Sequence, residues 1–483
     1  MSNILHLPIT TLAKLIRSGE ISPVELIESA FEAIDRGNPE LNAFITLFRE
    51  QSLEGARQAE REIREGHIRG PLHGMPIALK DIIHVTGAPT RCGSSFFSVD
   101  STRPDATVTA RLKGAGAIVI GKTNLHEFAY GVTTENPHFG TTANPWNTSH
   151  VAGGSSGGSA VAVAAGFSAG ALGTDTGGSV RIPAAMCGVV GLKPTYGRIS
   201  VTGVLELAQS LDCVGPICRR VEDAAVIMNA LAGYDISDVN SVNRSVPDYT
   251  DSLSDSVSGM KAGLPRQHCF EDLHPDVESS VAEAIEILGQ LGVEVVELDL
   301  PSIPDAHQAT LTLLMAEASH FHRKRLAEHR EDYSHDVREI IEDGRKFSAS
   351  DYVAAVRVRE QARREFARAF ECVNFLLTPT VPAPAPLRSM MDTSEGSDSN
   401  RMRPRLTQNT RIFNLLGLPA ISVPCGFTAE SLPVGLQIVG RWWAEDELLR
   451  VAHTYEQATP WHGMSPNDNG AEADKNSVST IRG

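Results

Sequence analysis

The sequence is short of paired cysteines, of positive charge and of long apolar runs. Its seven cysteines are odd in number and scattered, with no C-x-x-C, which argues against a disulfide framework and a zinc site. The net charge of −16 argues against nucleic acid or an anionic membrane as the main partner. No run approaches the roughly 18 apolar residues of a membrane span, and the first residues lack a signal-peptide pattern. We therefore expect a cytoplasmic protein with reduced thiols.

What remains is the composition of an ordinary globular protein, with 41% hydrophobic and 21% charged residues among 483. Helix-like and strand-like segments alternate along most of the chain, which predicts an α/β fold with a largely buried sheet. The expected helices include 8–20, 51–66, 221–231 and 275–291. Ser22-Pro23-Val24-Glu25 predicts the start of a further helix, with a capping serine and a glutamate three residues after it. The expected strands include 41–47, 75–79, 293–298, 372–377, 413–427 and 433–440.

Two Gly-Ser clusters lie close together between 151 and 198, and we expect the site there. Ser155, Ser156 and Ser159 belong to the first cluster and Ser179 to the second, with a run of small apolar residues over 160–173. Glycines beside a serine allow unusual backbone conformations and let a ligand approach the main chain. A serine held in this way, with free N–H groups nearby, suits a nucleophile and its oxyanion hole.

Other interpretations of these clusters fit less well. A flexible Gly/Ser linker would not carry the apolar residues between and after the clusters. A phosphate-binding loop would need Gly-Lys-Ser/Thr after its glycines, which is absent. The formal G-x-S-x-G at 153–157 follows a polar loop, not the apolar strand of an α/β-hydrolase. Over 123–131, a loop entering a helix, His126-Glu127 does not continue as H-E-x-x-H, so no metal site is expected.

Lys80 stands in an unusual place for a lysine, directly after the apolar run Met75 to Leu79. A buried lysine must pair, reach solvent or lose its proton, because burial disfavours the charged form. One interpretation is an ion pair with Asp81 or another carboxylate. The other is a general base with a lowered pKa.

These segments together resemble the amidase signature family, serine hydrolases with a Ser–cis-Ser–Lys triad. The resemblance covers about residues 8–460, and the central block is the most specific part. The matching pieces are G-M-P-I-A-L-K-D (74–81), T-N-L-H-E-F-A-Y-G (123–131), G-G-S-S-G-G-S-A (153–160), T-D-T-G-G-S-V-R-I-P (174–183), G-L-K-P-T-Y-G-R (191–198) and G-L-P-A-I-S-V-P-C-G (417–426).

The resemblance implies a role for each matching residue. Ser179 would be the nucleophile, Ser155 the bridging serine after a cis peptide bond, and Lys80 the base that takes the proton through Ser155. The oxyanion hole would consist of the N–H groups of Thr176, Gly177, Gly178 and Ser179. The supporting residues would be Ser156, Asp175 and Arg181, and the acyl-binding side would be bordered by Tyr130, Gly131 and Thr174.

The resemblance also implies the organisation of the chain. It predicts one large domain with a central mixed sheet covered by helices on both faces. We expect an N-terminal helical segment over 1–70 and the core over 71–460. Within that core we expect a helical substrate-side region at 311–370 and a mobile loop at 386–408. A disordered tail is expected over 464–483.

The expected activity is hydrolysis of a small or aryl amide, or of a related ester or carbamate, through an acyl-enzyme and without a cofactor. Because Lys80 must be neutral to act, activity should rise toward alkaline pH. One alternative is the glutaminase A subunit of a tRNA-dependent amidotransferase, although residues 315–326 (M-A-E-A-S-H-F-H-R-K-R-L) differ from the segment usual there. Another is an inactive binding protein on the same fold.

The expected partner is a small-molecule amide, with no nucleic acid and no membrane, and a homodimer is the oligomer considered.

Overall fold

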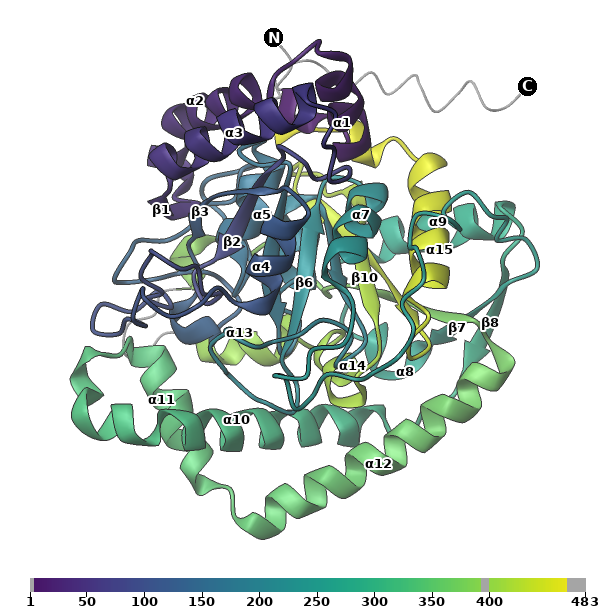
Figure 1. The fold of residues 1–483 in the computed structure, drawn as a ribbon. Coiled ribbons are helices and arrows are strands. Elements are labelled where there is room, and N and C mark those ends of the chain that lie inside the picture. The colour runs from purple at the N-terminus through teal and green to yellow at the C-terminus, as the bar shows by residue number, and fades with distance from the viewer. Residues whose placement is uncertain (1–3, 392–398, 467–483) are drawn as a thin grey trace.

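Eleven strands form one mixed sheet through the centre of the computed structural model, which describes residues 4–391 and 399–466. The strand order is β1-β3-β2-β4-β6-β5-β10-β11-β9-β7-β8 (Figure 1). β2 runs parallel to β3 and β4, and β7 runs parallel to β8 and β9, whereas the other neighbours are antiparallel. The strands are β1 Phe44–Leu47, β2 Pro76–Lys80, β3 Ile118–Thr123, β4 Gly170–Asp175, β5 Val190–Lys193, β6 Cys213–Cys218, β7 Lys261–Pro265, β8 Glu294–Leu298, β9 Phe375–Pro379, β10 Ala420–Phe427 and β11 Pro433–Gly440.

Helices cover both faces of this sheet, which confirms the predicted fold class. Because successive side chains of a strand point to opposite faces, Ile77 and Leu79 of β2 enter one core and Ala78 enters another. The first core is shared with α1 Ile9–Ser18, α4 Thr107–Gly114, α7 Val221–Leu231, α9 Pro275–Gln290 and α15 Glu445–Gln457. The second is shared with α2 Pro23–Leu41, α3 Arg49–Arg64, α5 Gly157–Ala164 and α6 Arg181–Cys187.

A further core lies under the long helices that run along one end of the molecule (Figure 1). It is formed by α10 Ile303–Glu328, α12 Ala349–Cys372 and α14 Arg411–Leu416. The remaining helices are α8 Arg266–Cys269, α11 His335–Asp343 and α13 Ser399–Leu406. The region 311–370, which we expected on the substrate side, is occupied by α10, α11 and α12.

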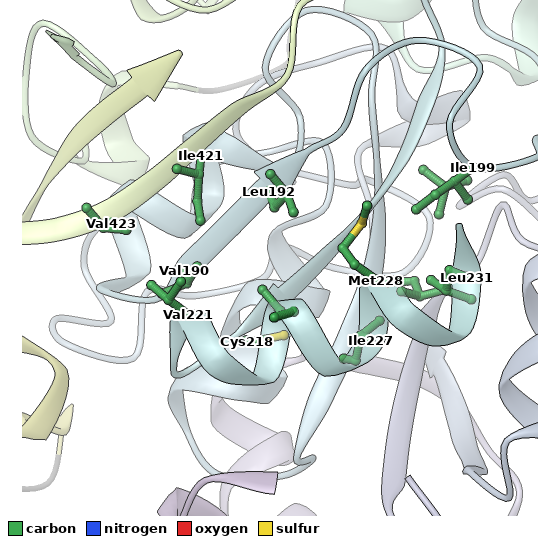
Figure 2. Close-up of a cluster of buried hydrophobic side chains, with 14 of the residues drawn as sticks. Val190, Leu192, Ile199, Cys218, Val221, Ile227, Met228, Leu231, Ile421 and Val423 are labelled. Atoms are coloured by element: carbon green, nitrogen blue, oxygen red, sulfur yellow. The ribbon is translucent and has the colours of Figure 1, made fainter. Parts of the chain in front are cut away.

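The packing of α7 shows how the first core is built. Figure 2 shows side chains of α7 lying over β5, β6 and β10. Burying one such aliphatic side chain contributes about 1.5–3 kcal/mol. The labelled residues are Val190, Leu192, Ile199, Cys218, Val221, Ile227, Met228, Leu231, Ile421 and Val423.

Several local predictions are confirmed and others are wrong. Ser22 and Glu25 form the expected capping box at the start of α2. The strand expected over 413–427 is wrong in its first part, because residues up to Leu416 belong to α14, and Gly417 ends that helix in a left-handed conformation. At 123–131 the expected helix is only a 3₁₀ turn, Glu127–Ala129. The expected loop 386–408 contains a 3₁₀ turn, Arg388–Met390, and α13.

The predicted division of the chain at residue 70 and the predicted tail stay predictions. Most of the tail, 467–483, and residues 392–398 of the expected loop lie outside the described residues. α1 packs on α7, so the N-terminal helices share the core that lies over the sheet. None of the helices in the described part of the chain is long and apolar enough to cross a membrane.

Candidate active site

Lys80 is the last residue of β2 and is completely buried. It follows Ala78 by two positions, so it points to the same face of the sheet, toward α5. Its Nζ lies 2.8 Å from Ser155 Oγ and 2.8 Å from Thr174 Oγ1. The lysine predicted as the base is therefore in hydrogen-bond contact with the predicted bridging serine.

The alternative ion pair between Lys80 and Asp81 is wrong. Asp81 instead pairs with Lys122, at 3.4 Å between Nζ and Oδ1. In the described part of the chain, no carboxylate lies within ion-pair distance of Lys80. Burial lowers the pKa of Lys80 to about 7, and the more distant charges of Asp175 and Asp212 only partly oppose that shift. A lysine with this pKa can act as a base near neutral pH.

Ser155 and Ser156 bring the two Gly-Ser clusters together. The peptide bond between Gly154 and Ser155 is cis, as the resemblance implied. Ser156 N donates to the carbonyl oxygen of Ser179 at 3.3 Å, and its Oγ lies 3.2 Å from the carbonyl oxygen of Thr174. No hydrogen bond joins the hydroxyls of Ser155 and Ser179 within the described residues. Such contacts often tighten only when a substrate is bound.

The turn that carries Ser179 is held by a buried ion pair. Arg181 Nη2 lies 2.9 Å from Asp175 Oδ1, and both side chains are fully buried. Burial would raise the pKa of Asp175, but the neighbouring guanidinium of Arg181 holds it well below its usual value. The structure thus pairs the two residues expected to support the turn.

One of the four predicted oxyanion donors is already engaged. Gly178, which has a φ of 129°, donates its N–H to Asp175 Oδ1 at 2.8 Å. The N–H groups of Thr176, Gly177 and Ser179 stay the candidate donors for an oxyanion. Removing one such donor typically costs about 3–4 kcal/mol of the barrier.

We expect Asp175→Ala to destabilise the protein by about 3–5 kcal/mol, because Arg181 would be left buried without its carboxylate. Urea unfolding of the variant and the parent checks this value. Glu54→Ala is the matched control: it removes a carboxylate from the exposed ion pairs with Arg57 and Arg61, and should cost less than about 1 kcal/mol. An equally small cost for Asp175→Ala would show that the buried pair does not hold the turn.

A cavity of about 330 Å³ opens beside Ser179. Tyr130 and Gly131, the residues predicted to border the acyl-binding side, line it together with Thr176 and Gly177. Thr174 does not line it: its hydroxyl contacts Lys80, and the residue borders a separate cavity. Thr174 thus contacts the predicted base, and does not border this cavity as we had expected. The other lining residues are Ala129, Val132, Leu207, Leu311, Leu314, Met315, Glu339, Ile340, Asp343, Arg403, Pro404, Thr407 and Arg411.

Sequence reasoning missed three residues of this region. Arg403 and Arg411 line the cavity, and Asp212 accepts a hydrogen bond from Thr176 Oγ1 at 2.5 Å. Burial raises the pKa of Asp212 to about 7. An arginine leading the apolar run R-I-F-N-L-L was the available sign of a buried charge at Arg411. Within residues 4–391 and 399–466, no three His, Cys, Asp or Glu side chains are placed to hold a metal ion.

The mixed sheet and the buried serine–lysine cluster are those of a hydrolase that cleaves C–N bonds. The sequence model of a family described as Amidase matches residues 25–449, and the chain belongs to this amidase signature family. The A subunit of glutamyl-tRNA(Gln) amidotransferase from Geotalea daltonii is 40% identical and aligns with 95% of this chain and 98% of its own.

Two solved structures have the same fold. The A subunit of glutamyl-tRNA(Gln) amidotransferase from Thermotoga maritima is 36% identical with a TM-score of 0.82, over 96% of this chain and 98% of its own. A bacterial aryl acylamidase of the amidase signature family is 28% identical with a TM-score of 0.85, over 95% and 97% of the two chains.

These relatives contradict the expected partners. We expected only a small-molecule amide, with no nucleic acid and no membrane, and a homodimer as the oligomer considered. The curated relatives are named as subunits of an enzyme that is itself named for glutamyl-tRNA(Gln). The net charge describes one chain alone, so it does not exclude membership of an assembly in which another subunit contacts nucleic acid.

Proposed function

We propose that this chain hydrolyses a carboxamide through an acyl-enzyme on Ser179. The observation that carries the proposal is the contact of the buried Lys80 with Ser155, beside the turn of Ser179 and the cavity of about 330 Å³. All three side chains have the chemistry that a nucleophile, a proton relay and a base require. This also argues against an inactive binding protein.

The proposed mechanism has two steps. Ser179 Oγ attacks the carbonyl carbon while its proton passes to Ser155, whose own proton moves to Lys80 Nζ. The N–H groups of Thr176, Gly177 and Ser179 stabilise the oxyanion. The relay then delivers a proton to the leaving nitrogen, and the C–N bond breaks. Water attacks the acyl-Ser179 ester with the relay working again as base, and the acid and free Ser179 are released.

The relatives favour glutamine as the amide, with this chain as the A subunit of a tRNA-dependent amidotransferase. Support comes from the 40% identity along 95% of the chain to a protein of that name. In that role the ammonia released at Ser179 would be passed on to a partner subunit.

A second candidate is a free-standing amidase for small or aryl amides, with related esters or carbamates as further substrates. The segment 315–326 favours it, because it departs from the one usual in the glutaminase subunits. Met315 of this segment lines the cavity, together with the apolar side chains of Leu311 and Leu314. The likeness to an aryl acylamidase supports the same candidate.

The experiment that separates them is amine and ammonia release by the purified chain alone at about pH 8.5. The substrates are glutamine, a primary aliphatic amide, an acetanilide, an aryl carbamate and an aryl ester, with Ser179→Ala as the blank. Turnover of any amide other than glutamine supports the free-standing amidase. Turnover of glutamine only, or only after partner subunits are added, supports the amidotransferase subunit. No Ser179-dependent turnover under either condition would overturn the proposal.

A further inference from the structure

Arg411 is a buried arginine in the wall of the cavity that holds Ser179. It begins α14, and only 4% of its surface is exposed. Its guanidinium donates through Nη2 to Thr407 Oγ1, whereas Nη1 has no hydrogen-bond partner among the described residues. No carboxylate in the described part of the chain forms an ion pair with it. Buried charges are normally paired with an opposite charge. The described residues supply no such counter-ion to Arg411.

Two more donors line the same cavity. Arg403 of α13 donates through Nη2 to Asp336 at 2.6 Å, and its Nη1 has no partner among the described residues. The buried hydroxyl of Tyr130 likewise has none, and the guanidinium of Arg403 lies 5.9 Å from the centre of the Tyr130 ring. Three residues that line one cavity therefore each carry a buried donor without an acceptor among the described residues. Unsatisfied buried donors are rare and call for a ligand or an ordered water.

The acidic residues nearby do not neutralise Arg411. Asp343 lines the cavity but pairs with Lys346, and Glu339 has its own partner within the chain. Asp336 is bound by both His126 and Arg403. Burial lowers the pKa of Arg411 to about 9, so the guanidinium is still charged at pH 7. The cavity thus presents a positive charge whose counter-ion must come from outside the chain.

We propose that Arg411, assisted by Arg403 and Tyr130, forms a carboxylate-binding subsite beside Ser179. The substrate is then an amide whose acyl part carries a carboxylate; this inference rests on the proposed acyl transfer at Ser179. A carboxylate offers planar acceptor oxygens that match the forked donors of a guanidinium. Leu311, Leu314 and Ile340 provide apolar surface for the short carbon chain between the two ends of the substrate.

The first test compares isosteric substrates with and without the charge. The pairs are malonamate with 3-methylbutanamide, succinamate with 4-methylpentanamide, and glutaramate with 5-methylhexanamide. For the parent, kcat/KM should favour the charged member of at least one pair about 100-fold. Arg411→Met should reduce that preference about 30-fold or more, which is the effect of breaking a buried charged contact. Arg411→Lys should retain part of this preference. Arg405→Met, which replaces a nearby but exposed arginine in α13, should leave the preference unchanged.

The second test measures binding without catalysis. Ser179→Ala protein is titrated calorimetrically with succinate and with glutarate, and the titration is repeated with Ser179→Ala/Arg411→Met and Ser179→Ala/Arg411→Lys. We expect at least one dicarboxylate to bind, and its affinity to fall about 30-fold or more with methionine and less with lysine. If neither binds and no charged amide is preferred, the subsite is wrong even when Ser179 is the nucleophile. If dicarboxylates bind through Arg411 but Ser179→Ala does not affect turnover, the proposed acyl transfer fails and the subsite stands.

Discussion

Ser179→Ala is expected to lower kcat for amide hydrolysis by at least about ten-thousand-fold. Alanine cannot form the acyl intermediate, and removing the nucleophile of a serine hydrolase leaves only the weak effect of the oxyanion donors and of substrate binding. The residue is 8% exposed, so losing its hydroxyl should affect stability little compared with activity. Initial rates of ammonia or amine release, measured with the best substrate of the panel, check the value.

Two serines of the first Gly-Ser cluster complete this experiment, Ser159 as the control and Ser155 as the test of which serine is the nucleophile. Ser159 is equally small and buried, but its Oγ lies 2.8 Å from Thr123 Oγ1 and 3.1 Å from the carbonyl oxygen of Leu172, away from the relay. Ser159→Ala should therefore retain activity. Ser155→Ala should lose activity and react more slowly with a fluorophosphonate, but the label should still be on Ser179. If labelling survives in Ser179→Ala and disappears in Ser155→Ala, the nucleophile is Ser155 and our assignment is wrong.

The parts of the fold that could be predicted from sequence are those governed by local rules. The capping box of Ser22 and Glu25 needs only four consecutive residues, and the apolar run ending at Lys80 marks a buried strand by itself. The segment 160–173 did not reveal its division into α5 and β4. Its only polar residue is Ser168, so its hydrophobicity shows neither the helical period nor the strand period.

The site residues that could be predicted from the sequence each lie within a continuous motif, including Lys80 and Ser155, which are far apart in the chain. Asp175 and Arg181 are six residues apart, and their ion pair spans only the turn that carries Ser179. Arg411 lies far from Ser179 in sequence and enters the cavity only because α14 packs against the turn, where Thr410 Oγ1 donates to the carbonyl oxygen of Gly177 at 2.7 Å. No local pattern in the sequence encodes that contact. Substrate contacts of this kind depend on tertiary packing, so they required the structure.

Lys80→Met should lower kcat/KM by at least about a thousand-fold, because the variant has a side chain of similar length and no base. In the parent, kcat/KM should rise about tenfold per pH unit below pH 7 and level off above it, since burial lowers the pKa of Lys80 to about 7 and only the neutral amine accepts a proton. The residual activity of the variant should lose this rise. A parent profile that stays flat from pH 5 to 9, with chemistry rate-limiting, would contradict the role of Lys80.

Lys80→Met should lower activity but raise the free energy of unfolding below pH 7. This contrast separates a lysine that serves function from one that serves stability. An unfolded lysine titrates near 10.4 and Lys80 near 7, so between these values the unfolded chain binds more protons and the stability of the parent rises with pH. Below pH 7 burial of the charged amine costs about 5 kcal/mol, from the difference between the two pKa values. Lys80→Met removes this cost, although Ser155 and Thr174 lose a hydrogen-bond partner. Urea unfolding at pH 6, 8 and 10 should therefore show a pH-dependent gain in the parent that the variant lacks. If both proteins have the same pH dependence, Lys80 keeps an ordinary pKa and cannot be the base near neutral pH.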